Sequence, residues 1–407
     1  MSIKSFFSLP VFTLIIVVMS CNEPQPAKEN EPAKGTYGYD AAFLKKHLKQ
    51  TIELFNEEGA RVLLTPDYQG RVMTSSAGKD TGNSFGWINY DLIASGKFKP
   101  QFNAVGGEER FWIGPEGGQY SFYFKQGDSF NIRHWQVPPV VDTIPYNVVK
   151  SDSNSAVFRQ TATVTNYSGT PFSIEITRGV KLLDKETLSG RLHAGIPAGV
   201  KWVAYETDNA VKNVGTNEWK KETGLLSIWL LGMFTPSDET VTIVPFKNIP
   251  DAKNYVTDNY FGKIPEDRLL TSDSTLLLKC DGKHRSKLGL SPAIARSVAG
   301  SYDYKRNVLT LILFEVDTSG AYVNSKWELQ KEPYKGDVVN AYNDGPLEDG
   351  SQLGPFYEIE SSSAAQELKP GGTQRYRQVT CHFEGDYTAL QDMALKLLGV
   401  KLDSIKM

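Results

Sequence analysis

Two glutamates separated by a single residue are the best candidates for chemistry in this sequence. Glu358 and Glu360 lie in a short β-type run inside the polar, glycine-rich stretch of residues 336–385. Because successive side chains of a strand point to opposite faces, both carboxylates are expected on one face. Asn343 and Asp344 precede them in a polar loop of the same stretch. Such a cluster can transfer protons or hydrogen-bond sugar hydroxyls; the alternative is a solvated edge strand with two surface glutamates.

Helices are expected only near the two ends of the chain. Asp40 can cap a helix that runs to about Glu58, and Asp386 can cap a last amphipathic helix. Between them, turn signals separate short β runs. These runs are expected at residues 61–64, 120–124, 156–165, 172–183, 225–231, 241–244, 276–280 and 308–316. So many strands without intervening helices predict a mainly β fold, a large antiparallel β-supersandwich with short flanking N- and C-terminal helices.

An export signal and a lipid anchor are expected at the N-terminus. Residues 1–20 have a positive start and an apolar core that is too short to span a bilayer, which needs about 20 residues. They end before Cys21 in a sequence that resembles the lipobox of bacterial lipoproteins; the alternative is an ordinary secretory signal with a chance cysteine. Residues 21–36 fit a flexible tether. Residues 37–407 are then expected to form a single domain, anchored in the cell envelope through lipidated Cys21.

Composition excludes several classes of partner and cofactor. The 44 basic and 47 acidic side chains give a net charge of −3 without a basic stripe, which argues against nucleic acid as a partner. The five histidines show neither HxH nor HExxH spacing, so we expect no metal site and no cofactor. Cys280 and Cys381 could form a disulfide or remain buried thiols, and both alternatives stay open.

Three stretches of the sequence carry a resemblance to a known family. They are residues 63–72 (LLTPDYQGRV), residues 106–116 (GGEERFWIGPE), and residues 357–360 (YEIE) with the turn at 368–372 (LKPGG). In this order and spacing they resemble the galactose mutarotase-like superfamily, the β-supersandwich of aldose epimerases. The chain also looks like the mutarotase-like lipoproteins of Bacteroidetes. The resemblance implies a carbohydrate cleft and an enzyme that acts at the anomeric carbon.

The family's roles can be transferred to several residues of this chain. Arg110 matches an arginine that contacts the sugar, although its alternative role is a structural ion pair with a neighbouring glutamate at 108, 109 or 116. His134 matches a histidine about two dozen residues further on, and its alternative is a surface histidine. The glutamate base would be Glu358 or Glu360, which strand periodicity cannot distinguish.

The general acid of the family has no clear counterpart. Residues 227–229 (Ser-Ile-Trp) occupy roughly the position of the family's acid histidine, and His134 or His193 could substitute. Asp344, or alternatively Asp281, could hydrogen-bond sugar hydroxyls. Since mutarotation needs both an acid and a base, the alternatives to an enzyme are a non-catalytic glycan-binding lipoprotein and a structural envelope lipoprotein.

Aromatic and basic residues complete the predicted site. Trp219 lies in a polar loop and is the candidate for an exposed sugar platform, whereas Trp112, Trp202 and Trp229 are assigned to the core. The basic run at residues 281–287 is interpreted as a solvated turn, with a cleft for an acidic sugar as the alternative.

Overall fold

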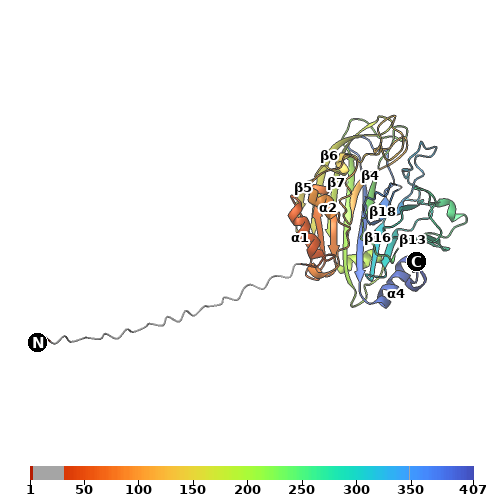
Figure 1. Ribbon diagram of the computed structural model, residues 1–407. Helices are drawn as coiled ribbons and strands as arrows, with labels where there is room; N and C mark the ends of the chain where they lie inside the picture. Colours follow the sequence, from red (N-terminus) through yellow and green to blue (C-terminus); the bar gives the residue numbers. More distant parts are fainter. Residues whose placement is uncertain (3–31, 348) are drawn as a thin grey trace. The chain divides into compact units, whose positions relative to one another are not determined.

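Antiparallel strands are the main secondary structure of the computed structural model (Figure 1). It describes residues 1–2, 32–347 and 349–407. The expected export signal, Cys21 and most of the expected tether therefore lie outside the described residues. Residues 32–407 form one compact unit, and the predicted domain boundary at residue 37 stays a prediction.

The larger sheet has ten strands. In sheet order they are β12 (Leu269–Thr271), β13 (Thr275–Lys279), β10 (Thr240–Pro245), β15 (Val298–Asp303), β16 (Val308–Phe314), β19 (Thr373–Glu384), β8 (Lys201–Asn213), β7 (Pro171–Leu182), β6 (Ser155–Thr165) and β5 (Asn147–Ser151). Strand β7 shows why these segments form strands: Phe172, Ile174 and Ile176 alternate with more exposed residues and are fully buried. This period of two buries one face of the strand and not the other.

The smaller sheet has six strands and carries the two glutamates. In order they are β11 (Val256–Thr257), β14 (Ser286–Leu290), β17 (Val339–Asn343), β18 (Tyr357–Ser362), β9 (Ser227–Leu231) and β4 (Arg110–Gly114). Tyr342 lies opposite both Lys287 and Glu358. Leu231 in turn lies opposite both Glu360 and Arg110. Directly opposed residues point to the same face, so this register gathers charged residues from three strands, β14, β18 and β4, on one side of the sheet.

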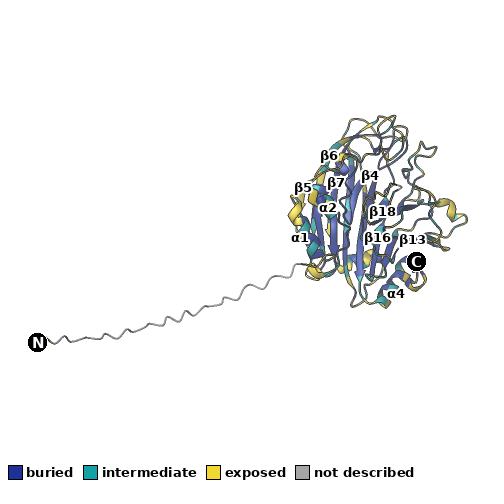
Figure 2. Ribbon diagram, in the orientation of Figure 1, coloured by how far each residue is buried: buried dark blue, intermediate teal, exposed yellow. Residues whose placement is uncertain are grey.

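The two sheets pack face to face around the main hydrophobic core, to which β7 and β8 contribute along with β9 and β18. Helices α3 (Lys185–Leu192) and α4 (Tyr387–Leu398) cover the outer face of the ten-stranded sheet. Helices α1 (Tyr37–His47) and α2 (Tyr90–Ser95) pack against a third sheet of β1 (Ile52–Phe55), β2 (Arg61–Thr65) and β3 (Arg71–Ser76). Figure 2 shows the strands mostly buried and the exposed residues in loops and on helix surfaces. The predicted antiparallel sandwich is confirmed.

The predicted N-terminal helix is too long. Helix α1 begins after the cap residue Thr36 and ends at His47, and Leu48 is already extended. Residues 52–55 form β1, which pairs with β2. The Asn56 side chain accepts hydrogen bonds from the backbone N–H groups of Gly59 and Ala60, so the chain reverses here into a hairpin instead of continuing a helix.

The predicted strand at residues 120–124 is also wrong. Phe122, Tyr123 and Phe124 are buried in a loop, where they pack against other aromatic rings. Their hydrophobicity reflects this packing and not a place in a sheet. The last helix is confirmed, because Asp386 accepts hydrogen bonds from the N–H groups of Thr388 and Ala389.

The open question about the two cysteines has a structural answer within the described residues. Cys280 and Cys381 are buried thiols and form no disulfide. No helix in the described part of the chain is long and apolar enough to cross a membrane.

Candidate functional site

A cavity of about 420 Å³ lies against the face of the six-stranded sheet that carries the charged residues. Aromatic and charged side chains together make up most of its lining. The aromatic lining residues are Phe102, Trp112, Trp135, Trp229, Phe261, Trp327, Tyr342 and Phe356. The charged lining residues are Lys99, Arg110, Glu116, Arg285, Lys287, Asp344 and Glu358. An apolar cavity with a few converging polar groups is the usual form of a small-molecule site.

Glu358 on β18 and Arg110 on β4 form a buried ion pair. Nη2 of Arg110 lies 2.9 Å from Oε1 of Glu358, and both side chains are almost fully buried. The contact lacks hydrogen-bond geometry. Within the described residues, Oε1 of Glu358 and Nε and Nη1 of Arg110 are buried without a hydrogen-bond partner. Because unmet hydrogen bonds of buried polar groups are costly, these atoms are suited to bind a polar ligand in the cavity.

Glu360 lies deeper, two residues along the same strand face. Its Oε2 accepts hydrogen bonds from Nε1 of Trp229 at 2.9 Å and from Nζ of Lys287 at 3.0 Å. Lys287 also lies 4.9 Å from the centre of the Trp229 ring, a cation–π contact. Burial lowers the pKa of Lys287, but the attraction of Glu360 and Glu116 outweighs burial, and the net pKa is raised. Lys287 therefore stays charged and Glu360 is held in place by it.

The pKa of Glu358 suits a group that transfers protons. Burial raises its pKa from the ordinary 4.5 to about 7; the Arg110 guanidinium lowers it, and the neighbouring Glu360 raises it. A catalytic carboxyl group works best when its pKa lies near the working pH. Glu358 is thus the stronger candidate for a base, which strand periodicity alone could not decide.

Asp344 forms the opposite edge of the charged group. Its Oδ1 accepts a hydrogen bond from the Tyr342 hydroxyl at 2.5 Å, and its Oδ2 accepts one from the N–H of Gly354 at 3.0 Å. Burial raises the pKa of Asp344, and these hydrogen bonds partly offset the increase. Arg285 donates from Nε to the Tyr342 hydroxyl at 3.3 Å, so a chain of contacts links the arginine to the aspartate.

Glu116 is a further carboxyl group that lines the cavity. Burial raises its pKa, Lys287 lowers it, and Glu360 raises it. The pKa values of Glu116, Asp344 and Glu358 are all raised, and Glu116 and Glu358 form one pair of such carboxyl groups in the cavity. Such a pair can supply an acid and a base to one bound molecule.

The structure brings Arg110, Asp344, Glu358 and Glu360 together, but not His134. His134 is exposed, and its Nδ1 lies 3.1 Å from the backbone oxygen of Ser129. It lines a different cavity, whereas its neighbours Ile132 and Trp135 line the cavity at the glutamates. His134 thus lies outside the cavity lining, although two of its neighbours in the loop belong to it.

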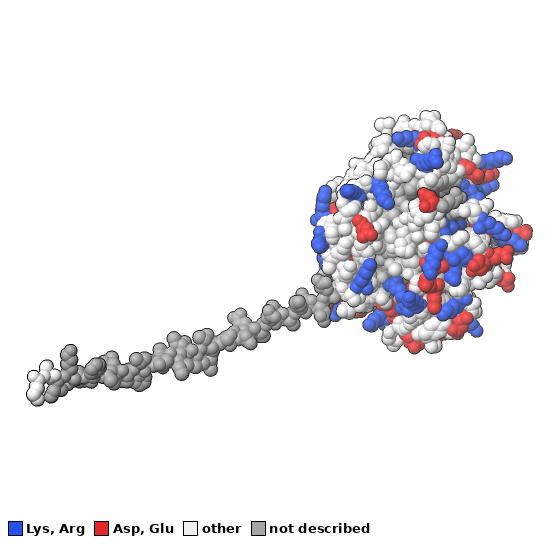
Figure 3. Space-filling view, viewed as in Figure 1, with Lys and Arg blue, Asp and Glu red and all other residues white. Residues whose placement is uncertain are grey.

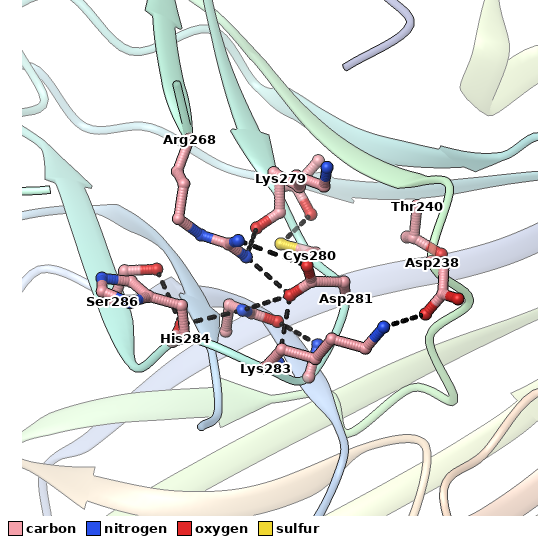
Figure 4. Close-up of polar contacts among 12 residues, drawn as sticks. Asp238, Thr240, Arg268, Lys279, Cys280, Asp281, Lys283, His284 and Ser286 are labelled. Atoms are coloured by element: carbon pink, nitrogen blue, oxygen red, sulfur yellow. Dashed lines mark hydrogen bonds and ion pairs between the residues drawn. The ribbon is translucent and has the colours of Figure 1, made fainter. Parts of the chain in front are cut away.

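Asn343 is not part of the cavity either, because it faces the other side of β17. The side chain is fully buried, accepts a hydrogen bond from the N–H of Gly282, and donates to the backbone oxygen of His284 and to Asp281. Figure 4 shows the surrounding turn, in which Asp281 binds Arg268 at 2.6 Å. Asn343 and Asp281 thus hold this turn and are not sugar contacts.

Trp219, which was predicted to be an exposed sugar platform, is buried instead. Its side chain is only 3% exposed and packs against Phe172 in the core between the sheets. The polar residues around it suggested an exposed loop, but the indole is the part of that loop that is buried. Trp112 and Trp229, which were assigned to the core, are buried and also line the cavity.

Two of the glutamates predicted as alternative partners of Arg110 contact other residues. Glu108 contacts His382 and Ser75, and Glu109 pairs with Arg178 at 3.0 Å. Both glutamates are fully buried, and both reach residues of the ten-stranded sheet. The expected pairing of Arg110 with Glu108, Glu109 or Glu116 is wrong, because its partner is Glu358.

Sequence reasoning missed Lys287, Glu116 and four tryptophans as lining residues. The alternative for the basic run at 281–287, a cleft for an acidic sugar, pointed at Arg285 and Lys287 but was not preferred.

Within the described residues, no group of three or more His, Cys, Asp or Glu side chains is arranged to hold a metal ion. Lys, Arg, Asp and Glu side chains are interspersed on the face shown in Figure 3.

Comparisons with known proteins give a family and a fold. A family model described as "Family of unknown function (DUF6786)" matches residues 35–407. A search of curated proteins found no match. Among solved structures, a proposed aldose 1-epimerase of Escherichia coli K12 has a TM-score of 0.50 at 9% identity, and the match covers 82% of this chain and 98% of that chain.

Two further solved structures are similar over most of their length. A galactose mutarotase-like protein of Lactobacillus casei ATCC 334 has a TM-score of 0.48 at 11% identity, covering 82% of this chain and 100% of that chain. A Synechocystis sp. PCC 6803 protein has a TM-score of 0.49 at 13% identity, covering 83% and 96%. At such low identity the E. coli likeness shows the fold alone, which is mutarotase-like.

Proposed function

This chain belongs to the family of unknown function DUF6786, and we propose that it binds a carbohydrate in the cavity of its six-stranded sheet. The observation that carries the proposal is the Arg110–Glu358 pair beside the Trp112 ring. The centre of that ring lies 4.5 Å from the Arg110 guanidinium carbon. A sugar needs an aromatic face for its C–H groups and charged hydrogen-bonding groups for its hydroxyls, and the cavity offers both side by side.

The hydrogen-bonding capacity of the cavity fits hydroxyl groups in particular. A hydroxyl both donates and accepts, so hydroxyls can donate to Oε1 of Glu358 and accept from Nε or Nη1 of Arg110 once these atoms, which have almost no exposed surface, become accessible. These are the atoms left without hydrogen-bond partners within the described residues. An apolar ligand would leave them unmet.

The second candidate function is proton transfer at the anomeric carbon of the bound sugar, favoured by the pKa of Glu358 near 7. In this scheme ionised Glu358 takes the proton of the anomeric hydroxyl, and Arg110 stabilises the carboxylate before the transfer. Glu116 remains protonated to higher pH than an ordinary glutamate and donates a proton to the ring oxygen. The ring then opens, and reversal of both transfers closes it on either face.

Binding and catalysis are tested by two measurements on the same protein. Calorimetric titration with neutral aldoses tests binding, and exchange NMR of the same sugars follows the two anomers with and without protein. The Glu358→Gln variant keeps the shape of the side chain and removes the base. Absence of binding across a broad panel of sugars would refute the proposal. Binding without accelerated exchange would refute the catalytic function and support the alternative, a non-catalytic glycan-binding protein.

We also propose that the chain is a lipoprotein of the cell envelope, akin to the mutarotase-like lipoproteins of Bacteroidetes, with its carbohydrate-binding domain tethered to the membrane through Cys21. The lipobox-like end of residues 1–20 and the proline-rich composition that follows support this proposal. A tether of this kind would hold the cavity near glycans at the membrane surface.

A further inference from the structure

We infer that the sugar bound in this cavity carries a carboxylate, and that Arg285 binds it. This inference rests on the proposed carbohydrate-binding function and narrows its substrate class to acidic sugars. It starts from the difference between Arg285 and the two buried cations of the cavity, Arg110 and Lys287.

Arg285 is held rigidly by uncharged groups. Its guanidinium carbon lies 3.7 Å from the centre of the Phe261 ring, and its Nε donates to the Tyr342 hydroxyl at 3.3 Å. Both of these aromatic residues line the cavity, as Arg285 does. The arginine is therefore oriented before any ligand arrives, which lowers the entropic cost of binding.

Arg285 is half-buried and lacks the charge partner that the two buried cations of the cavity have. Arg110 has Glu358 at 2.9 Å and Lys287 has Glu360 at 3.0 Å. Among the residues that the structure describes, no carboxylate lies within 4.0 Å of the Arg285 guanidinium nitrogens, and its two Nη groups make no hydrogen bond. Asp344 is reached only through the Tyr342 hydroxyl, and burial favours its protonated form. A positive charge thus remains available in the cavity.

The free atoms define the shape of the anion. Because Nε is engaged by Tyr342, the two Nη groups remain as a planar fork at the end of the side chain. Two parallel N–H donors match the two oxygens of a carboxylate. A sulfate or phosphate ester can engage the same fork through two of its oxygens, so these esters are the competing anions in the test.

The test compares matched sugars on matched variants. Glucuronate is titrated against glucose, and galacturonate against galactose, with glucose 6-sulfate and glucose 6-phosphate as the tetrahedral anions. The variants are Arg285→Gln, Arg285→Lys, and Arg296→Gln as the control, because Arg296 is exposed and lies outside the cavity lining. Circular dichroism of each variant checks that it is folded.

We expect the native protein to bind the uronates about tenfold or more tightly than the matched neutral sugars. Arg285→Gln should lower uronate affinity about 10- to 100-fold, the effect of losing a charge-assisted pair of hydrogen bonds, and leave neutral sugars within about threefold. Arg285→Lys should restore only part of the loss, and Arg296→Gln should have no effect.

Other outcomes separate this inference from the proposed function. Equal binding of uronates and neutral sugars, unchanged in Arg285→Gln, would refute the inference and leave the carbohydrate-binding cavity intact. Tighter binding of the sulfate or phosphate ester than of the uronate would refute the carboxylate assignment. Failure of every sugar to bind would overturn both proposals.

Discussion

Arg110 and Glu358 form an ion pair across an intervening strand. Nη2 of the arginine on β4 lies 2.9 Å from Oε1 of the glutamate on β18, and β9 lies between these two strands in the sheet. The pair spans the face of the sheet under the cavity, and it sets both the position and the protonation of the main candidate base. Most of the expected behaviour of the site follows from this contact.

The first prediction concerns stability as a function of pH. The pKa of Glu358 is about 7 in the folded protein and near 4.5 when exposed, so the folded state holds a proton that the unfolded state releases in this range. The group therefore makes the protein less stable as pH rises from about 4.5 to 7. Glu358→Gln removes this titration. Between about pH 4.5 and pH 8, the free energy of unfolding of the variant should therefore rise relative to that of the native protein by on the order of 3 kcal/mol.

Urea unfolding of both proteins across that range measures the difference. Glu328→Gln is the control, since Glu328 is exposed and lies outside the cavity lining. Parallel stability curves for native protein and Glu358→Gln would contradict the raised pKa.

The second prediction separates binding from proton transfer. Losing a positioned acid or base costs about 10²- to 10⁴-fold in rate, whereas binding depends on several contacts. The double variant Glu358→Gln, Glu360→Gln should therefore lose protein-catalysed anomer exchange by that factor, while its calorimetric affinity for the sugar falls less than about tenfold. The catalysed rate in the native protein should rise with pH through about 7, as Glu358 ionises.

Glu116→Gln provides the matched test of the acid. It should reduce the catalysed rate and leave the rise near pH 7 in place, because Glu358 is unchanged. Exchange at the native rate in the double variant would rule out these carboxylates as the base.

The third prediction uses the tryptophans of the cavity. Trp112, Trp135, Trp229 and Trp327 all line it, so a bound sugar should change the intrinsic fluorescence in a saturable way. Trp327→Ala should weaken binding about tenfold through lost ring contact. Trp219→Phe, at a buried position outside the cavity lining, should leave the affinity unchanged; an equal loss in both variants would indicate a general effect on folding.

The fourth prediction concerns Asn343. Replacing it with Ala removes a buried amide that accepts from Gly282 and donates to His284 and Asp281. Unpaired buried groups cost about 1–3 kcal/mol each, so Asn343→Ala should lower the free energy of unfolding by about 2–3 kcal/mol in urea titrations. Neutral-sugar affinity of the folded variant should stay within about threefold, and a selective loss of binding without a loss of stability would restore Asn343 as a ligand contact.

The fifth prediction concerns the N-terminus. Cys21→Ser should release the protein from the membrane fraction, because lipid on Cys21 is the proposed anchor. Fractionation at low and high salt distinguishes an anchor from electrostatic adhesion. A Cys21→Ser protein that stays membrane-bound in both conditions would disprove the lipidation.

The sequence by itself determined the fold class and placed the two glutamates of β18 on one face of that strand. Alternation of apolar residues is a local property, so β6, β7 and β16 were predicted nearly to their ends, and Glu358 and Glu360 were correctly placed on one face. The cap residue Asp386 likewise marks its helix locally. The N-terminal helix was predicted too long because residues 52–55 pair with β2, a strand contact that the helical pattern does not reveal.

Only the tertiary structure decided which residues share the cavity. Lys287 reaches Glu360 because β14 and β18 both pair with β17, and the strand order of a sheet is not encoded in the period of any one strand. The same holds for solvent exposure: Asn343, Trp219 and His134 were assigned to the site from their types and polar neighbours. Their side chains point into a turn, into the core and into solvent, because the direction of each is fixed by long-range packing and not by the residues next to it.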